Sequence, residues 1–198
     1  ANHSGSKVLC VHADYLDTVD KVRDQMTTVE HFVALEGGKP GWLDYEQLLA
    51  ASDDVFERPP IAEGDLLSIN YTSGTTSRPK GVMITHRNAW VNAVGTLAHL
   101  PMTPADRFLW SLPMFHANGW TYTWIVTAAA ALHVCLRQVD AATVYRLVNQ
   151  ECITMLCAAP TVLIAIASGP EEGRKSLRRG VRVQTAGAPP AAATIERM

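Results

Sequence analysis

The hydrophobic and polar positions of the chain alternate between short apolar runs and longer runs with helical spacing. Short apolar runs predict buried strands, and apolar residues three or four positions apart predict helices that pack by one face. From residue 106 onward these strands and helices alternate, which predicts parallel strands with helices on the sheet faces. The predicted fold is therefore α/β, with layered, mostly parallel sheets and flanking helices. The predicted strands are 7–13, 30–35, 65–72, 82–86, 107–113, 132–137, 153–158 and 181–187.

The predicted helices follow from apolar spacing and from residues suited to helix ends. Thr85 and Asp140 are predicted N-caps, while Pro160 is predicted to begin a helix and Gly169 to end it. Other helices are predicted at 15–26, at 118–131 and from residue 189 onward. The helix after Thr85 is expected to carry the following residues on one face: Trp90, Val94, Leu97 and Ala98.

Segment 37–65 differs from the rest of the chain because it is acidic and rich in glycine and proline. Such a composition predicts a loop-rich linker between strands, with one short helix at Tyr45–Ala51. The chain begins with a loop that leads into a strand and ends inside a predicted amphipathic helix. We therefore expect residues 1–198 to be an internal piece of a larger protein.

Composition and charge argue against some classes of function. Charged residues make up 18% of the chain, the formal net charge is −2, and the basic residues are scattered along the sequence. A nucleic-acid-binding protein usually concentrates positive charge on one face. Nucleic acid is therefore not an expected partner.

The cysteines and the long uncharged stretches bear on the compartment. Cys10, Cys135 and Cys152 lie in or beside apolar runs, and the chain has no C-x-x-C pair, which predicts buried, reduced thiols in a cytoplasmic protein. The uncharged stretches 108–136 and 152–170 are both interrupted by proline. They are better explained by a buried strand plus a packed helix than by a membrane span.

Residues 71–82, with the sequence YTSGTTSRPKGV, bring hydroxyl groups, glycines and a lysine together directly after a predicted strand. Backbone N–H groups of such a turn, with side-chain donors and a lysine, suit an anion such as phosphate. The phosphate loop of nucleotide triphosphatases does not fit, because Lys80 is followed by Gly81 and not by Ser or Thr. From these residues alone, an ordinary polar turn remains an equal alternative.

The same stretch resembles the phosphate-loop signature T-S-G-T-T-G-x-P-K-G of the adenylate-forming superfamily. Ser77 stands where that signature has glycine. The resemblance implies that residues 72–81 hold the β- and γ-phosphates of ATP, and that Lys80 and Thr76 are catalytic. The residues it assigns to the nucleotide in this loop are Thr72, Ser73, Gly74, Thr75, Thr76, Ser77 and Lys80.

Two further segments carry the resemblance. Residues 112–124, LPMFHANGWTYTW, resemble a P-M-F-H-x-N-G-W stretch of acyl-CoA synthetases. There the resemblance implies that His116 contacts nucleotide and acid and that Gly119 and Trp120 contact the acid. From chemistry alone, His116 could equally be a core or loop histidine, and Trp120 a core aromatic. Residues 184–198 resemble the adenine-binding turn of the family, with Gly187, Ala188 and Pro189 against the purine.

The resemblance covers nearly the whole chain and implies part of the large N-terminal domain of an acyl-CoA synthetase. Such an enzyme joins a carboxylic acid to ATP as acyl-AMP and then transfers the acyl group to coenzyme A, with Mg²⁺ on the phosphates. No metal-ligating motif is found in this chain, and the family's C-terminal lid domain is expected to lie beyond it. The resemblance leaves a homo-oligomer open. Two alternatives also remain open, namely transfer to a carrier protein and a non-catalytic nucleotide-binding module.

Overall fold

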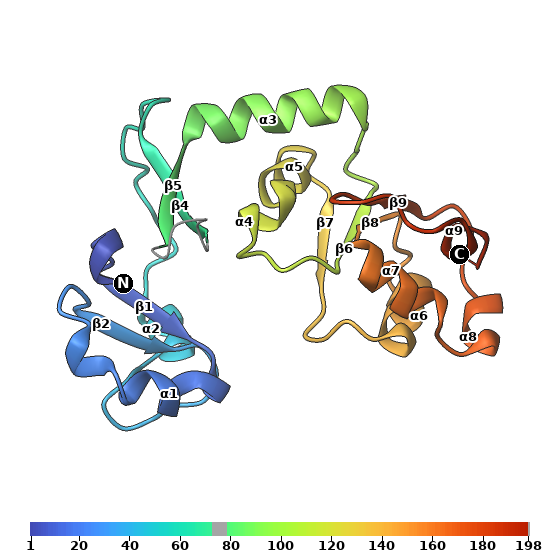
Figure 1. Ribbon diagram of the computed structural model, residues 1–198. Helices are drawn as coiled ribbons and strands as arrows, with labels where there is room; N and C mark the ends of the chain where they lie inside the picture. Colours follow the sequence, from blue (N-terminus) through green and yellow to red (C-terminus); the bar gives the residue numbers. More distant parts are fainter. Residues whose placement is uncertain (73–78, 198) are drawn as a thin grey trace. The chain divides into compact units, whose positions relative to one another are not determined.

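The computed structural model describes residues 1–72 and 79–197, which form two compact units (Figure 1). The first unit comprises Ala1–Ile61, and the second begins at Ala62. The boundary between them lies inside the predicted linker 37–65. Each described sheet and each described hydrophobic cluster lies within one unit, so each unit is described by itself.

The first unit is built on a small parallel sheet in the order β1-β2-β3. Leu9 pairs with Phe32, and Val33 pairs with Leu43. Its core contains Phe32 and Trp42, whose rings meet edge to face at 5.6 Å. The elements are η1 Asn2–Ser4, β1 Val8–Val11, η2 Ala13–Tyr15, α1 Leu16–Asp20, η3 Arg23–Gln25, β2 His31–Ala34, β3 Leu43–Asp44 and α2 Tyr45–Ala51.

The continuous helix predicted at 15–26 is wrong, because only Leu16–Asp20 is α-helical. Val22 leaves the helical region at φ −125° and ψ 6°, and its N–H bonds to the carbonyl of Val19 three residues back. Long-range contacts hold the short helix instead. Lys39 lies 2.5 Å from Asp17, and the indole of Trp42 donates to Asp20 at 3.0 Å.

The predicted linker 37–65 contains more regular structure than its composition indicates. The short helix predicted at Tyr45–Ala51 is confirmed as α2, and the Asp44 side chain caps it by accepting from the N–H of Gln47 at 3.0 Å. Strand β3 was not predicted. It is only two residues long and pairs with β2 beside the buried Trp42.

The second unit combines an antiparallel hairpin with a parallel sheet (Figure 1). Strands β4 (Leu66–Thr72) and β5 (Lys80–Thr85) form the hairpin, and helix α3 (His86–His99) follows directly. The parallel sheet has the order β7-β6-β8-β9. The remaining elements are β6 Arg107–Trp110, α4 Ala117–Trp120, α5 Tyr122–Ala128, β7 Leu132–Cys135, α6 Ala141–Gln150, β8 Met155–Cys157, α7 Pro160–Ala167, α8 Glu171–Lys175, β9 Arg182–Gln184 and α9 Ala192–Arg197.

Several predicted helix ends are confirmed in this unit. Thr85 forms a capping box with Asn88 at the start of α3, and Asp140 accepts from the N–H of Thr143 at the start of α6. Pro160 occupies the first turn of α7, where its missing N–H leaves no hydrogen bond unmade. Local chemistry was sufficient at these positions because each cap bonds within its own first turn.

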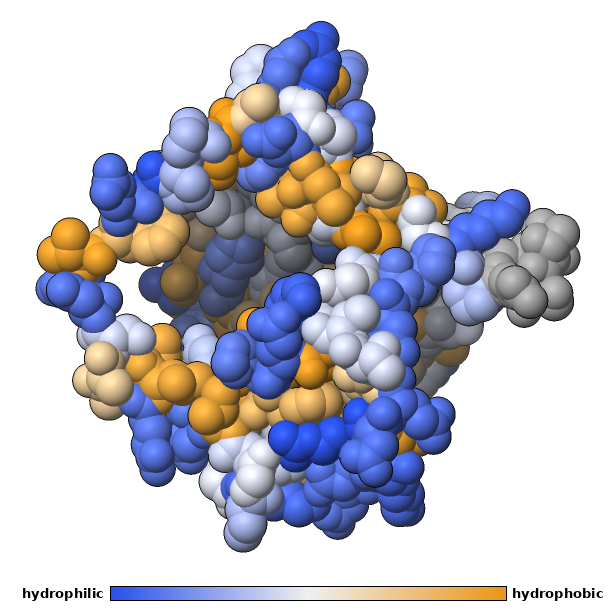
Figure 2. All heavy atoms as spheres, turned by 90° about the vertical axis from the view of Figure 1, so that its left-hand side faces the viewer, coloured by the Kyte–Doolittle hydropathy of each residue, from blue (hydrophilic) through white to orange (hydrophobic). Residues whose placement is uncertain are grey.

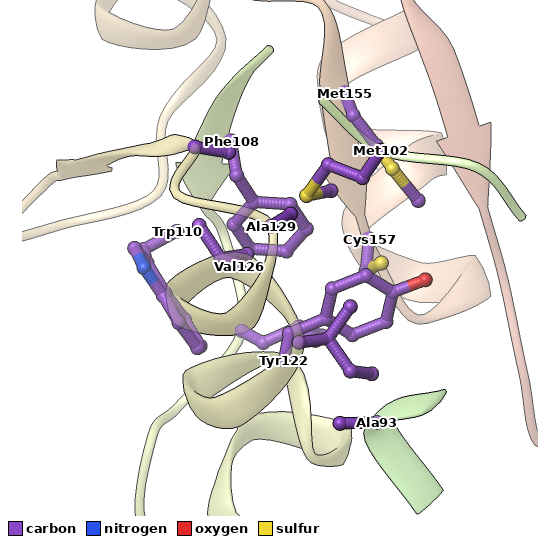
Figure 3. Close-up of a cluster of buried hydrophobic side chains, with 12 residues drawn as sticks. Ala93, Met102, Phe108, Trp110, Tyr122, Val126, Ala129, Met155 and Cys157 are labelled. Carbon is purple, nitrogen blue, oxygen red and sulfur yellow. The ribbon is translucent and has the colours of Figure 1, made fainter. Parts of the chain in front are cut away.

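Two hydrophobic clusters cover the two faces of the parallel sheet. Phe108 and Trp110 of β6 pack into a cluster with α5, whereas Leu109 packs into a cluster with α6 and α7. The alternation follows from the opposite directions of successive side chains in a strand. Figure 3 shows the first cluster, in which the Phe108 and Tyr122 rings stack with their centroids 4.8 Å apart.

The face predicted for α3 is only partly packed: Leu97 contacts the core cluster, whereas Trp90 and Val94 do not lie in the core. The helix buries Ala89 and Ala93, while Trp90 is 67% exposed and Val94 is also exposed. Small side chains lie toward α5 because the two helices approach closely there, and this leaves the larger ones outside. Figure 2 shows apolar areas in orange among hydrophilic ones in blue on one face of the molecule.

The predicted burial of three cysteines is also wrong. Cys10, Cys135 and Cys152 are exposed, and Cys157 is the buried one. All four are free thiols.

Over residues 1–72 and 79–197, no helix has both the length and the apolar character needed to cross a bilayer.

Asp106 joins three strands at the amino end of the parallel sheet. Its carboxylate accepts from Thr154 Oγ1 at 2.7 Å, from the Thr103 N–H at 2.7 Å and from Arg182 Nη2 at 2.6 Å. Burial by itself raises the pKa of Asp106, but these hydrogen bonds and the positive charge of Arg182 outweigh it. The pKa therefore lies below its ordinary value of 3.8.

We expect Asp106→Asn to lower the free energy of unfolding at pH 7 by about 1–3 kcal/mol, because charged hydrogen bonds are lost. A depressed pKa stabilises the fold above pH 4 or so, and this contribution disappears as the pH falls through the lowered pKa. Urea unfolding from pH 7 to pH 2.5 should show a shallower loss of stability at the acid end for Asp106→Asn than for wild type. The exposed Glu57→Gln should follow wild type, and a profile shared by all three proteins would contradict this role.

We expect Phe108→Ala to lower the free energy of unfolding by about 3–5 kcal/mol, because a fully buried ring leaves a cavity. Phe108 is 0% exposed, whereas Phe115 is 85% exposed. Phe115→Ala is therefore the matched control and should change stability by less than about 0.5 kcal/mol. Urea unfolding followed by circular dichroism distinguishes the two, and equal effects would show that the Phe108 cluster is not the core.

Candidate functional site

The two ends of the candidate phosphate loop lie opposite each other in the hairpin. Thr72 at the end of β4 pairs with Lys80 at the start of β5, and both are exposed. The hairpin therefore places the Thr72 hydroxyl and Lys80 directly before and after the intervening loop. Five predicted loop residues lie outside the described residues: Ser73, Gly74, Thr75, Thr76 and Ser77.

The segment 117–121 forms a left-handed turn between β6 and α5. All five residues have positive φ, from 44° at Ala117 to 67° at Thr121. Each non-glycine residue in this conformation costs about 1–2 kcal/mol. The helix predicted at 118–131 is thus wrong in its first turn, because right-handed helix α5 begins only at Tyr122. Backbone strain of this kind persists only where surrounding contacts hold it, which often marks a functional segment.

Hydrogen bonds hold the turn to the hairpin and to α3. Oδ1 of Asn118 accepts from Ser68 Oγ at 3.0 Å and from the side-chain amide of Asn70, both on β4. Thr121 Oγ1 donates to Oδ1 of Asn92 on α3 at 2.6 Å. The strand that leads into the phosphate loop is therefore tied directly to the segment predicted to contact the acid.

The three residues predicted to contact the acid lie in different environments. His116 precedes the turn and is exposed, and its carbonyl accepts from the N–H of Gly119 at 2.9 Å. Trp120 is half-buried and lines a pocket. Gly119 is buried at φ 60°, and a Cβ there would lie 2.4 Å from the Trp110 ring. The structure thus gives Gly119 a packing role, whereas Trp120 is available to a ligand.

Trp110 is itself held in place below the turn. Its indole N–H donates to Nδ1 of His133 at 2.9 Å, and Nε2 of His133 lies 3.1 Å from Thr127 Oγ1. Burial lowers the pKa of His133, which favours the neutral ring that can accept from Trp110. The indole is therefore a fixed surface on which Gly119 packs.

The turn predicted to bind adenine follows β9 at the carboxyl edge of the sheet. Gly187, Ala188 and Pro189 are all exposed, and Gly187 has φ 92°. Nothing lies within 4 Å of a Cβ at Gly187. The glycine is therefore favoured by its positive φ and not by a lack of space for a side chain. An exposed turn of small residues leaves a flat ligand room to approach its backbone.

A pocket of about 250 Å³ lies between α3, the start of α5 and the end of β9. Its position at the carboxyl ends of parallel strands is where α/β folds commonly bind ligands. The wall is mixed in character, with polar and apolar side chains. The lining includes Asn92, Thr96, Trp120, Tyr122, Ile125 and Gln184.

Three side chains from three elements meet at one end of this pocket. The Tyr122 hydroxyl of α5 donates to Oε1 of Gln184 on β9, and the Cys157 thiol of β8 lies 3.7 Å from the same oxygen. Figure 3 shows the Tyr122 oxygen beside the Cys157 sulfur. Burial raises the pKa of Tyr122, with a further contribution from Cys157, and burial also raises the pKa of Cys157 to about 12.

Sequence analysis missed the residues that assemble the site. Asn118 lies inside the motif 112–124, and a polar side chain directly before Gly119 could have indicated a hydrogen-bonded turn. Ser68 and Asn70 were part of a predicted strand, and alternation along that strand could have indicated that both side chains lie on one face. No local signal could have joined Gln184 to Tyr122, because they are 62 positions apart.

A metal ion held by protein side chains alone needs several ligating side chains close together. Over residues 1–72 and 79–197, no group of three or more His, Cys, Asp or Glu side chains is arranged to hold a metal ion. Hard cations such as Mg²⁺ take oxygen ligands, usually carboxylates together with phosphate oxygens. An Mg²⁺ ion held largely by nucleotide phosphates needs only one or two carboxylates from the protein.

Comparison with known proteins matches the whole chain to one family. A family model described as AMP-binding enzyme matches residues 1–198. The chain is 40% identical to probable acyl-activating enzyme 9 of Arabidopsis thaliana, in an alignment covering 98% of this chain and 38% of that protein. It is 36% identical to 4-hydroxybutyrate–CoA ligase 2 of Metallosphaera sedula, covering 100% of this chain and 38% of that protein.

The fold has a close counterpart among solved structures. The inhibitor-bound N-terminal domain of FACL13 from Mycobacterium tuberculosis superposes with a TM-score of 0.85 at 28% identity, covering 98% of this chain and 48% of that one. This likeness confirms the predicted α/β fold and the predicted superfamily. The chain spans 38% of the length of the two curated relatives described above.

We expect Gly119→Ala to lower the free energy of unfolding by about 1–3 kcal/mol more than conformational strain alone would, because the added Cβ meets the Trp110 ring. Gly180→Ala is the matched control, since Gly180 also has positive φ, 86°, but nothing within 4 Å of a Cβ. It should cost only the conformational strain, about 1 kcal/mol. Urea unfolding with tryptophan fluorescence measures both, and equal losses would show that Gly119 does not pack on Trp110.

Proposed function

The chain belongs to the AMP-binding enzyme family, and on that premise we propose that it forms the ATP- and acid-binding part of an acid–CoA ligase. The full reaction would join a carboxylic acid to ATP as acyl-AMP, release pyrophosphate and transfer the acyl group to coenzyme A. The relatives support this proposal, since one is named as a 4-hydroxybutyrate–CoA ligase.

The contact between β4 and the turn 117–121 is the observation that carries the proposal. Asn118 accepts from Ser68 and Asn70, so the strand that ends at Thr72 is fixed against the segment that contains Trp120. Adenylation requires the acid and the α-phosphate of ATP to lie side by side. A direct connection between the two segments proposed to bind them supplies that positioning.

Each segment would contribute differently to the chemistry. A carboxylate resists attack by a thiol because it is anionic and lacks a good leaving group, and ATP supplies AMP as that leaving group. Lys80, exposed opposite Thr72, would stabilise negative charge on the departing pyrophosphate. The turn at Gly187, Ala188 and Pro189 would hold the purine, and Trp120 would contact the acid.

The acid is proposed to be small. The pocket beside Trp120 measures about 250 Å³ and contains polar as well as apolar side chains, which suits a short acyl group. His116 is proposed to border the nucleotide and the acid from the start of the turn.

We also propose a cytoplasmic location, which is supported by the four free cysteines.

We expect Lys80→Ala, in the gene product that carries this chain, to lower kcat/KM for ATP–pyrophosphate exchange by about 10²–10³. The loss arises because the positive charge no longer opposes the charge that develops on pyrophosphate. Lys175→Ala is the matched control, since Lys175 is exposed and pairs with Glu171 at 2.6 Å on α8. It should retain wild-type exchange.

Exchange that is unchanged in Lys80→Ala would refute the role of this lysine. Absence of exchange in wild type, with every acid of a panel from acetate to benzoate, would refute the ligase itself. We further propose that the 198 residues alone do not turn over, because the chain spans only 38% of the length of the two relatives described above. Normal pyrophosphate release by the isolated chain would overturn that point.

A further inference from the structure

Gln184 has an asymmetric environment at the end of the pocket. Its Oε1 is the atom approached by both the Tyr122 hydroxyl and the Cys157 thiol. The raised pKa values keep Tyr122 and Cys157 protonated at neutral pH, so each has a hydrogen to donate. Two donors select the carboxamide oxygen, because the NH₂ group could not accept from either. The orientation of the Gln184 side chain is therefore fixed.

The amide nitrogen of Gln184 is left with its hydrogens free. Within the part of the chain that the structure describes, Nε2 of Gln184 has no hydrogen-bond partner. Thr185 Oγ1 is the one side-chain atom there that is both enclosed and without a partner, so Nε2 is not enclosed. Gln184 lines the pocket beside Trp120, so this N–H donor belongs to a side chain of the pocket wall.

We propose that Gln184 determines substrate specificity by favouring short acids that carry a hydrogen-bond acceptor, such as a hydroxyl or oxo group, at the end remote from the carboxylate. This inference rests on the proposed ligase function and on the pocket as its acyl site. A polar donor held in place stabilises an acceptor group. An alkyl chain at the same place leaves the donor unpaired, which costs free energy.

The rest of the pocket is compatible with such an acid. Ile125 and Trp120 supply apolar surface for methylene groups. Asn92 and Thr121, hydrogen-bonded to each other at 2.6 Å, add polar side chains to the lining. Among the described residues, none of those that line the pocket is charged, so recognition of the remote group would depend on neutral donors and acceptors.

Three acids of equal length can show whether the site recognises a hydrogen-bond acceptor or a hydrogen-bond donor at the remote end of the acid. 4-Hydroxybutanoate carries an acceptor, pentanoate carries a methyl group at the same position, and 4-aminobutanoate carries an ammonium that can only donate. With the gene product that carries this chain, ATP–pyrophosphate exchange should favour 4-hydroxybutanoate over both others by about tenfold or more in kcat/KM. Gln184→Met should reduce the preference over pentanoate to about one. Gln184→Glu should move the preference toward 4-aminobutanoate, because it replaces a donor by an anionic acceptor.

Matched variants distinguish this role from a general effect on the fold. Gln150→Met changes an exposed glutamine on α6 and should keep the wild-type preference. Tyr122→Phe removes one of the two donors that orient the carboxamide, and should reduce the preference for 4-hydroxybutanoate without the gain for 4-aminobutanoate. Circular dichroism of each variant confirms that it is folded.

The outcomes separate this inference from the function on which it rests. If wild type, Gln184→Met and Gln184→Glu all catalyse exchange with the same preference among the three acids, the role of Gln184 is overturned. The ligase function would still stand in that case. Absence of exchange with every acid would overturn both. A wild-type preference for pentanoate would also overturn this inference, because the donor would then not be meeting the acid.

Discussion

Burial of strand β6 on both faces is the constraint on which the second unit depends. Phe108, Leu109 and Trp110 are at most 3% exposed. Because successive side chains of a strand point in opposite directions, these residues require a packed layer on each side of the sheet. Helix α5 supplies one layer, and α6 with α7 supplies the other. The carboxyl ends of the parallel strands are thereby brought to one edge, where the segments of the candidate site follow.

The left-handed turn 117–121 depends on that same layer. Its backbone is unfavourable for L-residues, so it persists because outside contacts stabilise it. Trp110, held by His133, supports Gly119 from below, and Asn118 is fixed by Ser68 and Asn70 of β4. The turn 117–121 is thus stabilised both by packing on Trp110 and by hydrogen bonds to β4. As a consequence, the hairpin that carries the phosphate loop and the wall of the pocket are parts of one connected structure.

The sequence predicted much of the fold correctly where the signal was local. The alternation after residue 106 predicted the parallel sheet, and Thr85, Asp140 and Pro160 were correctly placed at helix starts. The predicted face of α3 packs against the core only through Leu97, because apolar spacing alone does not indicate how closely a neighbouring helix approaches. Close approach to α5 selects small residues instead, so alanines are buried and Trp90 is exposed. The site residues remain predictions: Thr72 and Lys80 pair in the hairpin and Trp120 lines the pocket.

The amino-acid sequence by itself determined the α/β alternation, the helix caps and the loop motif, because each depends on neighbours within a few positions. Only the tertiary structure decided which side chains meet. Tyr122, Cys157 and Gln184 come from α5, β8 and β9, and nothing in their local sequences indicates that they share one hydrogen-bonding site. The order β7-β6-β8-β9 brings them together. The physical reason is that strand order and helix packing set long-range distances, whereas spacing along the chain sets only local ones.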